Sequence, residues 1–261
     1  EMNQAERRLY LIRYLLAEDR RLAGMEIPPD KKGQEDLLRA LMNIRPPKPA
    51  DSEFLSVQDA YLREERDARG TTDASTLTPV RDNLCLWQGD ITTLAAGGIV
   101  NAANSALLGC FIPLHGCIDN IIHSRAGVQL RLACQELMEA QGHEEPTGQA
   151  KITPAYNLPS RFVLHTVGPV ITGRVTGEEE RLLASCYRSC LALAAENGLE
   201  SLAFCCISTG EFHFPNRLAA EIAVRTVEDW TRETESGMKV IFNVFKDTDL
   251  QIYREILEGE K

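Results

Sequence analysis

Three side chains that bind zinc well lie within one short segment of the sequence. Cys110, His115 and Cys117 supply two thiols and one imidazole. Zinc favours these ligands, and three protein ligands beside an open fourth position are typical of catalytic zinc sites. A closed structural site needs a fourth ligand, which this segment does not offer; His123 or Cys134 can supply it only if the fold brings them back. The spacing predicts one zinc ion per chain; the alternative is a pair of buried cysteines beside a hydrogen-bonded histidine.

Two polar residues on either side of this segment can take part in hydrolysis. Asn104 precedes it in a loop of small residues, and Asp119 follows it. An open zinc site positions a substrate oxygen or lowers the pKa of a bound water. Asp119 can orient or deprotonate that water while the amide of Asn104 fixes the substrate. We predict both as catalytic residues; the alternatives are a helix N-cap for Asp119 and an asparagine turn for Asn104.

Two loops can form a cradle for phosphate, because each follows an apolar strand candidate. One covers residues 101–105 and the other covers residues 208–215. Small residues and Gly210 let backbone N–H groups approach a phosphate, and Pro215 suits the first turn of a helix. Such loops meet at the carboxyl ends of the strands in an α/β sheet. Either loop alone can be an ordinary turn, but together they predict a cradle closed from two sides.

Strands and helices alternate from about residue 80 onward. Apolar runs predict strands at 84–87, 98–101, 151–154, 161–166, 201–207 and 239–244. Helical periodicity predicts helices at 118–140, interrupted near Gly127, and at 178–197, 216–231 and 248–258. This alternation predicts an α/β fold with a mixed, mostly parallel sheet covered by helices on both faces, which is a three-layer sandwich.

The first part of the chain is helical instead. Its apolar residues recur with helical periodicity, which predicts helices near 6–16, 34–43 and 56–68. Prolines follow the second helix, and no strand is predicted before residue 70. We expect a helical N-terminal extension over residues 1–75 that packs on a main domain over residues 80–261. The alternative is a lid or an element that docks a substrate protein.

Composition excludes some classes of partner and location. The formal net charge is −10, from 38 acidic and 28 basic residues, so a long nucleic acid is a poor partner. No apolar run reaches the roughly 18 residues that a membrane span needs, and the start is not signal-like. Six of the eight cysteines lie in apolar segments, unlike a secreted disulfide framework. We therefore expect a cytoplasmic protein without membrane contact.

The order of several short motifs resembles the macrodomain family over about residues 82–258. The motifs are GDIT at 89–92, IVNAANS at 99–105, IDN at 118–120, IH at 122–123, AG at 126–127 and STG at 208–210. Most macrodomains have a run of glycines between the asparagine loop and the aspartate. Residues 109–117 replace that run here, a departure that is similar to the microbial zinc-dependent macrodomains, which also carry a helical N-terminal extension.

The resemblance implies that the protein binds ADP-ribose and removes it from modified proteins with the help of zinc. It implies that Asp90 accepts a hydrogen bond from the adenine amino group beside the Ile91 N–H, and that Phe245 packs on adenine. It also implies that Asn104 holds the distal ribose and that Asp119 lies near the scissile bond.

The resemblance further implies that one loop wraps the diphosphate, with the residues Ser208, Thr209, Gly210, Glu211 and Phe212. Phe212 would lie against the distal ribose, and Glu211 faces either that ribose or solvent. His213 sits inside the same loop, whereas we expect His165 and His143 to be structural or solvated.

Two other functions use the same pocket. One is a reader that binds ADP-ribosylated protein without cleaving it, for which an open zinc site has no use; the other is a deacetylase of O-acetyl-ADP-ribose. Members of the family commonly occur with a sirtuin-like ADP-ribosyltransferase and a lipoyl-carrier protein. The resemblance therefore implies an ADP-ribosylated, lipoyl-carrier type of substrate protein.

Overall fold

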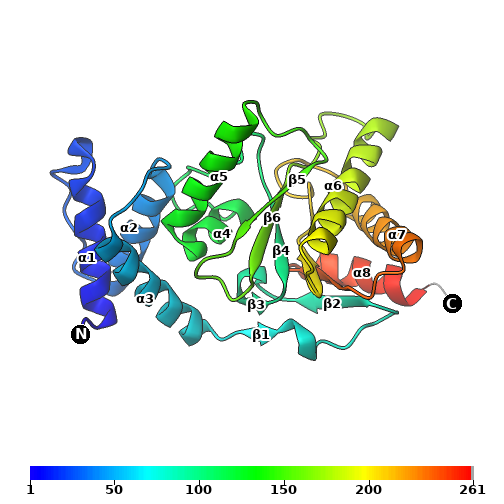
Figure 1. The fold of residues 1–261 in the computed structure, drawn as a ribbon, viewed down its shortest axis with the longest axis horizontal. Coiled ribbons are helices and arrows are strands. Elements are labelled where there is room, and N and C mark those ends of the chain that lie inside the picture. Colours follow the sequence, from blue (N-terminus) through cyan, green and yellow to red (C-terminus); the bar gives the residue numbers. More distant parts are fainter. Residues whose placement is uncertain (260–261) are drawn as a thin grey trace.

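A six-stranded mixed sheet forms the centre of the computed structural model, which describes residues 1–259 (Figure 1). The strand order is β2 (Leu84–Gln88), β8 (Lys239–Val244), β7 (Ser201–Phe204), β4 (Gly98–Ala102), β6 (Phe162–Thr166) and β5 (Ala150–Pro154). Neighbouring strands pair in parallel, except that the edge strand β5 runs antiparallel to β6. The predicted mixed, mostly parallel sheet is confirmed.

Helices cover both faces of this sheet. They are α4 (Ile118–Ala126), α5 (Val128–Gln141), α6 (Gly177–Glu196), α7 (Asn216–Thr234) and α8 (Asp247–Gly259). Figure 1 shows α4 and α5 on one side of the sheet and α6, α7 and α8 on the other. Gly127 separates α4 from α5 with a φ of 108°, a conformation that favours glycine. The predicted three layers and the predicted break near Gly127 are confirmed.

The strand predicted over residues 201–207 is shorter than expected. β7 ends at Phe204, and the chain then turns because the carbonyl of Cys206 accepts hydrogen bonds from the N–H (3.4 Å) and the hydroxyl (3.0 Å) of Thr209. Ile207 stays buried at 1% exposure although it has left the sheet. The apolar pattern predicted burial correctly at these positions but not strand pairing.

Three helices precede the sheet and gather at one end of the molecule (Figure 1). These N-terminal helices are α1 (Gln4–Ala17), α2 (Lys31–Ile44) and α3 (Ser52–Arg69). They surround a hydrophobic cluster of their own, which Val128 of α5 joins. α2 and α3 start earlier than predicted because Asp30 and Asp51 cap them, accepting from Gly33 N (2.9 Å) and Phe54 N (2.8 Å). The division into an extension and a main domain stays a prediction.

Short elements connect the helices and the sheet. The strands β1 (Thr72–Asp73) and β3 (Leu94–Ala95) form a small parallel pair. Residues 1–259 also contain three 3₁₀ turns, namely η1 (Arg20–Leu22), η2 (Ala74–Thr76) and η3 (Ile91–Thr93). Of these, η3 matters for the site because it carries the residues after Asp90.

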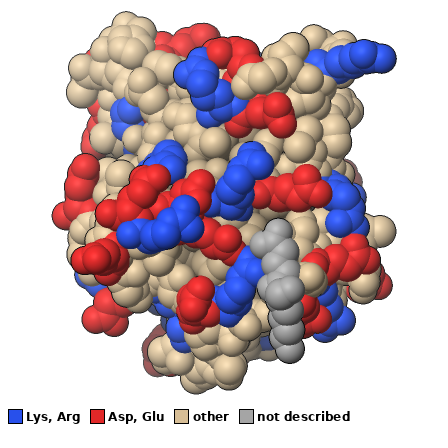
Figure 2. Space-filling model, turned by 90° about the vertical axis from the view of Figure 1, so that its right-hand side faces the viewer, with Lys and Arg blue, Asp and Glu red and all other residues tan. Residues whose placement is uncertain are grey.

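Acidic and basic side chains are interspersed on the face shown in Figure 2. Ion pairs also join neighbouring helices, such as Arg188 of α6 with Glu233 of α7 (2.9 Å) and Arg217 of α7 with Glu255 of α8. That face therefore offers no extended basic surface of the kind that binds nucleic acid. Among residues 1–259, the structure contains no helix with both the length and the apolar character of a membrane span.

Candidate active site

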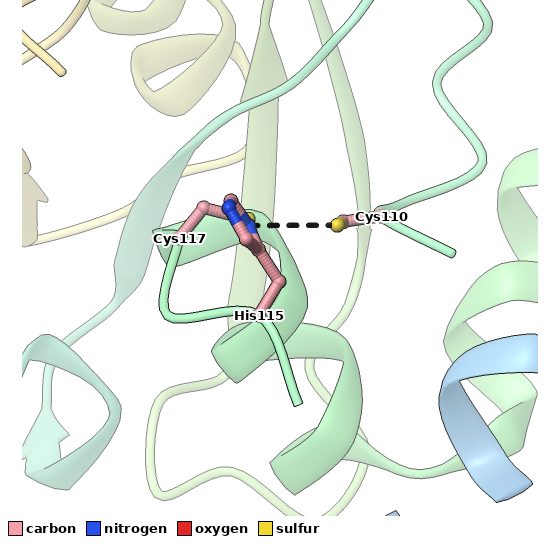
Figure 3. Close-up of side chains that lie close together, drawn as sticks. All are labelled: Cys110, His115 and Cys117. Atoms are coloured by element: carbon pink, nitrogen blue, oxygen red, sulfur yellow. Dashed lines mark hydrogen bonds between the residues drawn. The ribbon is translucent and has the colours of Figure 1, made fainter. Parts of the chain in front are cut away.

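The three predicted zinc ligands converge on one point. Figure 3 shows the side chains of Cys110, His115 and Cys117 pointing toward one another, and their potential ligand atoms all lie within 4.8 Å of each other. The Sγ of Cys110 is 3.8 Å from Nδ1 of His115, and all three residues are half-buried. Two sulfurs and one imidazole nitrogen around a common centre fit zinc. We call residues 108–117 the metal loop.

Cys117 also caps helix α4. Its Sγ accepts a hydrogen bond from the N–H of Asn120 (3.4 Å), and the partial positive charge of a helix N-terminus favours a thiolate there. Burial nevertheless raises the pKa of Cys117 to about 12, against the hydrogen bond from Asn120. A cation bound among these ligands would favour the thiolate of Cys117. The N-cap alternative for Asp119 is wrong, because Cys117 occupies that position.

A residue of the central sheet holds the side chain of Asp119. Its side chain is buried, and Oδ1 accepts a hydrogen bond from Nδ2 of Asn101 in β4 (2.8 Å). Burial raises the pKa of Asp119 to about 6, although the hydrogen bond from Asn101 and the charge of Arg131 oppose that rise. His123 Nε2 lies 3.5 Å from the same oxygen, but burial lowers the pKa of His123 well below its usual range. His123 is therefore neutral, and its contact with Asp119 is not an ion pair.

A second group of potential metal ligands is completely buried. It consists of His123, Cys134 and His165. Hydrogen-bond partners occupy both ring nitrogens of His165, since Thr153 Oγ1 lies 2.9 Å from Nε2 and Asn101 Nδ2 lies 3.3 Å from Nδ1. We therefore interpret His165 as part of a buried polar network, as expected, whereas neither ring nitrogen of His123 has a hydrogen-bond partner within residues 1–259. His123 and Cys134 belong to this group and not to the one formed by the metal loop.

The second predicted loop presents unused backbone donors. Within residues 1–259 the structure gives no acceptor to the N–H groups of Ser208, Gly210, Glu211 and Phe212. Successive free N–H groups in a turn form a site for phosphate. Ser208 has a φ of 65°, and its buried hydroxyl faces Gly168, where an added Cβ would lie 2.0 Å from Oγ. Gly168 is thus required for the loop, a role that the sequence analysis missed.

The metal loop and the 208–215 loop meet. Nε2 of His115 lies 2.9 Å from Oε1 of Glu211. Asn104 is exposed, and its Nδ2 donates to the carbonyl of Gly109 (3.3 Å), which leaves its Oδ1 for a ligand. The structure does not join Asn104 to Asp119; the asparagine that reaches this carboxylate is Asn101, which the sequence analysis placed in the loop without a role.

The predicted adenine end lies where β2 and β8 finish. Asp90 accepts at Oδ1 from the N–H of Thr92 (2.9 Å) and at Oδ2 from Arg125. Burial alone would raise the pKa of Asp90, but the hydrogen bonds from Thr92 and the charge of Arg125 outweigh it and lower the pKa. Phe245 is 75% exposed directly after β8, and its carbonyl accepts from the side chain of Gln88 (3.2 Å). Arg125 had no signal in the sequence.

Comparison with known proteins decides the family. The Macro domain family matches residues 100–223. A protein named "Protein-ADP-ribose hydrolase" from Treponema medium is 55% identical over 260 residues, covering 98% of this chain and 100% of that protein. The chain belongs to the macrodomain protein-ADP-ribose hydrolase family. A relative of the same name from Staphylococcus aureus strain MSSA476 is 54% identical over 222 residues, covering 84% of this chain and 83% of the relative.

Solved macrodomains share the fold. The Oceanobacillus iheyensis macrodomain with ADP is 40% identical with a TM-score of 0.62, over 70% of this chain and 95% of that one. The Trypanosoma brucei macrodomain in complex with ADP-ribose is 29% identical with a TM-score of 0.65, over 84% and 94%. A "Probable bifunctional ADP-ribose hydrolase/ADP-ribosyltransferase" from Fusarium oxysporum f. sp. cubense is 42% identical over 241 residues, which are 85% of this chain and 40% of that protein.

Proposed function

We propose that this macrodomain protein binds ADP-ribose and hydrolyses it from modified proteins. Relatives at 54–55% identity carry the name protein-ADP-ribose hydrolase, and similar macrodomains bind ADP or ADP-ribose in solved structures. The observation that carries the proposal in this chain is the 2.9 Å approach of His115 to Glu211. It brings a three-ligand metal centre to the edge of a loop of unused backbone donors.

The ligand would extend along the carboxyl ends of the strands. Adenine lies at Asp90 and the Ile91 N–H, with the exposed ring of Phe245 able to pack on it. The diphosphate takes the free N–H groups of the 208–215 loop, which need no side-chain charge to hold an anion. The distal ribose then reaches Asn104 and Phe212, and its anomeric carbon faces the metal loop.

Cys110, His115 and Cys117 would hold one zinc ion, which supplies a Lewis acid that positions a substrate oxygen and acidifies a bound water. Asp119 orients the attacking water. Asn101 and His123 approach its carboxylate at Oδ1, which leaves Oδ2 to accept a proton as the water oxygen bonds to the anomeric carbon. The bond from that carbon to the modified side chain breaks, and the side chain leaves with the proton that Asp119 took from the water.

The substrate protein is one that an ADP-ribosyltransferase has modified. The Fusarium relative is named a probable bifunctional ADP-ribose hydrolase and ADP-ribosyltransferase, which supports such a pairing. The narrower expectation of a lipoyl-carrier protein as substrate gains no support from the relatives' names.

Incubating the purified protein with an ADP-ribosylated acceptor protein tests the proposal. We expect free ADP-ribose and an unmodified acceptor as products. A reader module would bind the acceptor and release nothing. A deacetylase would release acetate from O-acetyl-ADP-ribose and leave the acceptor modified, and either outcome would overturn the proposed hydrolysis.

A further inference from the structure

The N-terminal helix α2 is hydrogen-bonded directly to the metal loop. Nη2 of Arg39 donates to the carbonyl of His115 (2.8 Å) and to Oδ1 of Asn120 (2.9 Å). One turn further along α2, Oδ1 of Asn43 accepts from the N–H of Leu114 (2.9 Å). Leu114 and His115 are therefore both hydrogen-bonded to a helix that lies more than 70 residues upstream in the chain.

A buried arginine fixes the other end of the loop to the same helix. Nη1 of Arg131, in α5, donates to the carbonyls of Asn43 (2.8 Å) and Arg45 (2.7 Å) at the end of α2. Its Nε and Nη2 donate to the carbonyls of Leu108 (2.7 Å) and Cys110 (3.2 Å). Terminal helix carbonyls lack partners within their own helix, so Arg131 satisfies them and holds the start of the metal loop at once.

The segment from Phe111 to Leu114 within the metal loop is not held in place by burial. Its apolar side chains are exposed, with Phe111 at 40%, Ile112 at 58% and Leu114 at 43%. Leu114 has a φ of 60°, a left-handed conformation that is strained for a non-glycine residue. This strained residue is the one whose N–H donates a hydrogen bond to Asn43. The conformation of the loop therefore depends on polar contacts from outside it.

We propose that α2 is part of the metal centre, with Arg39 and Asn43 as positioning residues for His115. This inference rests on the proposed zinc site. Arg39 fixes the carbonyl of His115, and Asn43 fixes the N–H of Leu114, the preceding residue. The two side chains thereby set the direction in which the imidazole of His115 leaves the backbone. His115 then faces Cys110 and Cys117 before the metal binds, and less ordering is required on binding.

Zinc affinity of the full-length protein tests the inference, measured by competition with a chromophoric chelator. Loss of a group that orients a metal ligand weakens metal binding by about 10- to 100-fold. We expect that loss for Arg39→Met and for Asn43→Leu, and a smaller loss for Arg39→Lys, which keeps one donor for the His115 carbonyl. The absorption spectrum of bound Co²⁺ should change in the same order, because it reports the geometry of the ligands.

Gln58→Ala is the matched control. Gln58 is 1% exposed and joins α3 to α5 by accepting from the N–H of Val128 (2.9 Å), away from the metal loop. We expect Gln58→Ala to lower stability and to leave zinc affinity within about twofold of the wild type. Thermal unfolding in the presence of a chelator shows which variants are folded, and Arg39→Lys keeps the test usable if Arg39→Met is not.

The outcomes separate the inference from the proposed function. Wild-type zinc affinity in folded Arg39→Met and Asn43→Leu would overturn the inference alone. An equal loss of affinity in Gln58→Ala would also overturn it, because general loosening of the N-terminal helices would then explain the effect. A wild-type protein that binds no zinc would overturn the zinc site and the inference together.

Discussion

Asn101 donates a hydrogen bond from Nδ2 to Oδ1 of Asp119 across 2.8 Å, which fixes the carboxylate from strand β4. Helix capping in the same region is performed by Cys117. The position of Asp119 is therefore set by the sheet. Substitutions at Asp119 can test its chemistry without removing a helix cap.

Asp119→Asn should slow ADP-ribose release about 10²- to 10⁴-fold, as expected when a general base is lost. The amide oxygen of asparagine still accepts the hydrogen bond from Asn101, but it takes no proton from water. ADP-ribose itself should bind with nearly wild-type affinity, because its adenine and diphosphate contacts lie on other loops. Single-turnover release and calorimetry measure the two effects. Near-normal release by the zinc-loaded variant would show that Asp119 is not the base.

Asp90→Ala should weaken ADP-ribose binding by about 1.5–3 kcal/mol, the range for a hydrogen bond to a charged group. Zinc content should not change, because Asp90 lies at the adenine end. Asp73→Ala is a matched control, since Asp73 caps η2 by accepting from Ser75 N (2.9 Å) as Asp90 caps η3. Calorimetry should find wild-type affinity for the control, and equal affinities for both variants would mean that the pocket is misplaced.

Burial of His165 should make folding stability fall on acidification. Burial lowers its pKa from 6.5 to about 4, whereas in the unfolded chain it takes up a proton near 6.5. Its contribution is therefore complete above pH 6.5 and is lost as the pH falls toward 4. Between pH 7 and pH 5 the loss is roughly 2 kcal/mol.

Urea unfolding of His165→Gln in the presence of a chelator checks this value. The free energy of unfolding should change by roughly 2 kcal/mol less between pH 7 and pH 5 than in the wild type. The exposed His143 provides the control, because His143→Gln should keep the wild-type dependence on pH. The same pH dependence in His165→Gln would show that His165 is not a buried neutral group.

Local patterns in the sequence sufficed for most of the fold. The apolar run around Ile99 predicted a strand, and Gly127 predicted the break between two helices, because each signal lies within the element that it specifies. The predicted starts of α2 and α3 were late, since Asp30 and Asp51 were not read as caps. A helix cap depends on a single side chain, whereas hydrophobic periodicity is a property of many residues and does not locate the cap.

The site could be predicted only in part. The ligand spacing of Cys110 and Cys117 is local, and the meeting of two loops follows from parallel strands. Arg39, Arg125 and Arg131 escaped prediction because their acceptors lie 33 to 89 residues away along the chain in most cases. No local pattern marks an arginine whose partners lie on another helix or loop.

Hydrolysis should require a zinc ion held by the metal loop. The most direct measurement determines zinc content and ADP-ribose release on the same samples of wild type, Cys110→Ser/Cys117→Ser and the control Cys85→Ser. Cys85 is a buried cysteine of β2 outside the metal loop. We expect about one zinc per chain in the wild type and the control, and neither zinc nor appreciable release in the double variant. Wild-type release by a zinc-free double variant, or full zinc occupancy in it, would contradict the account.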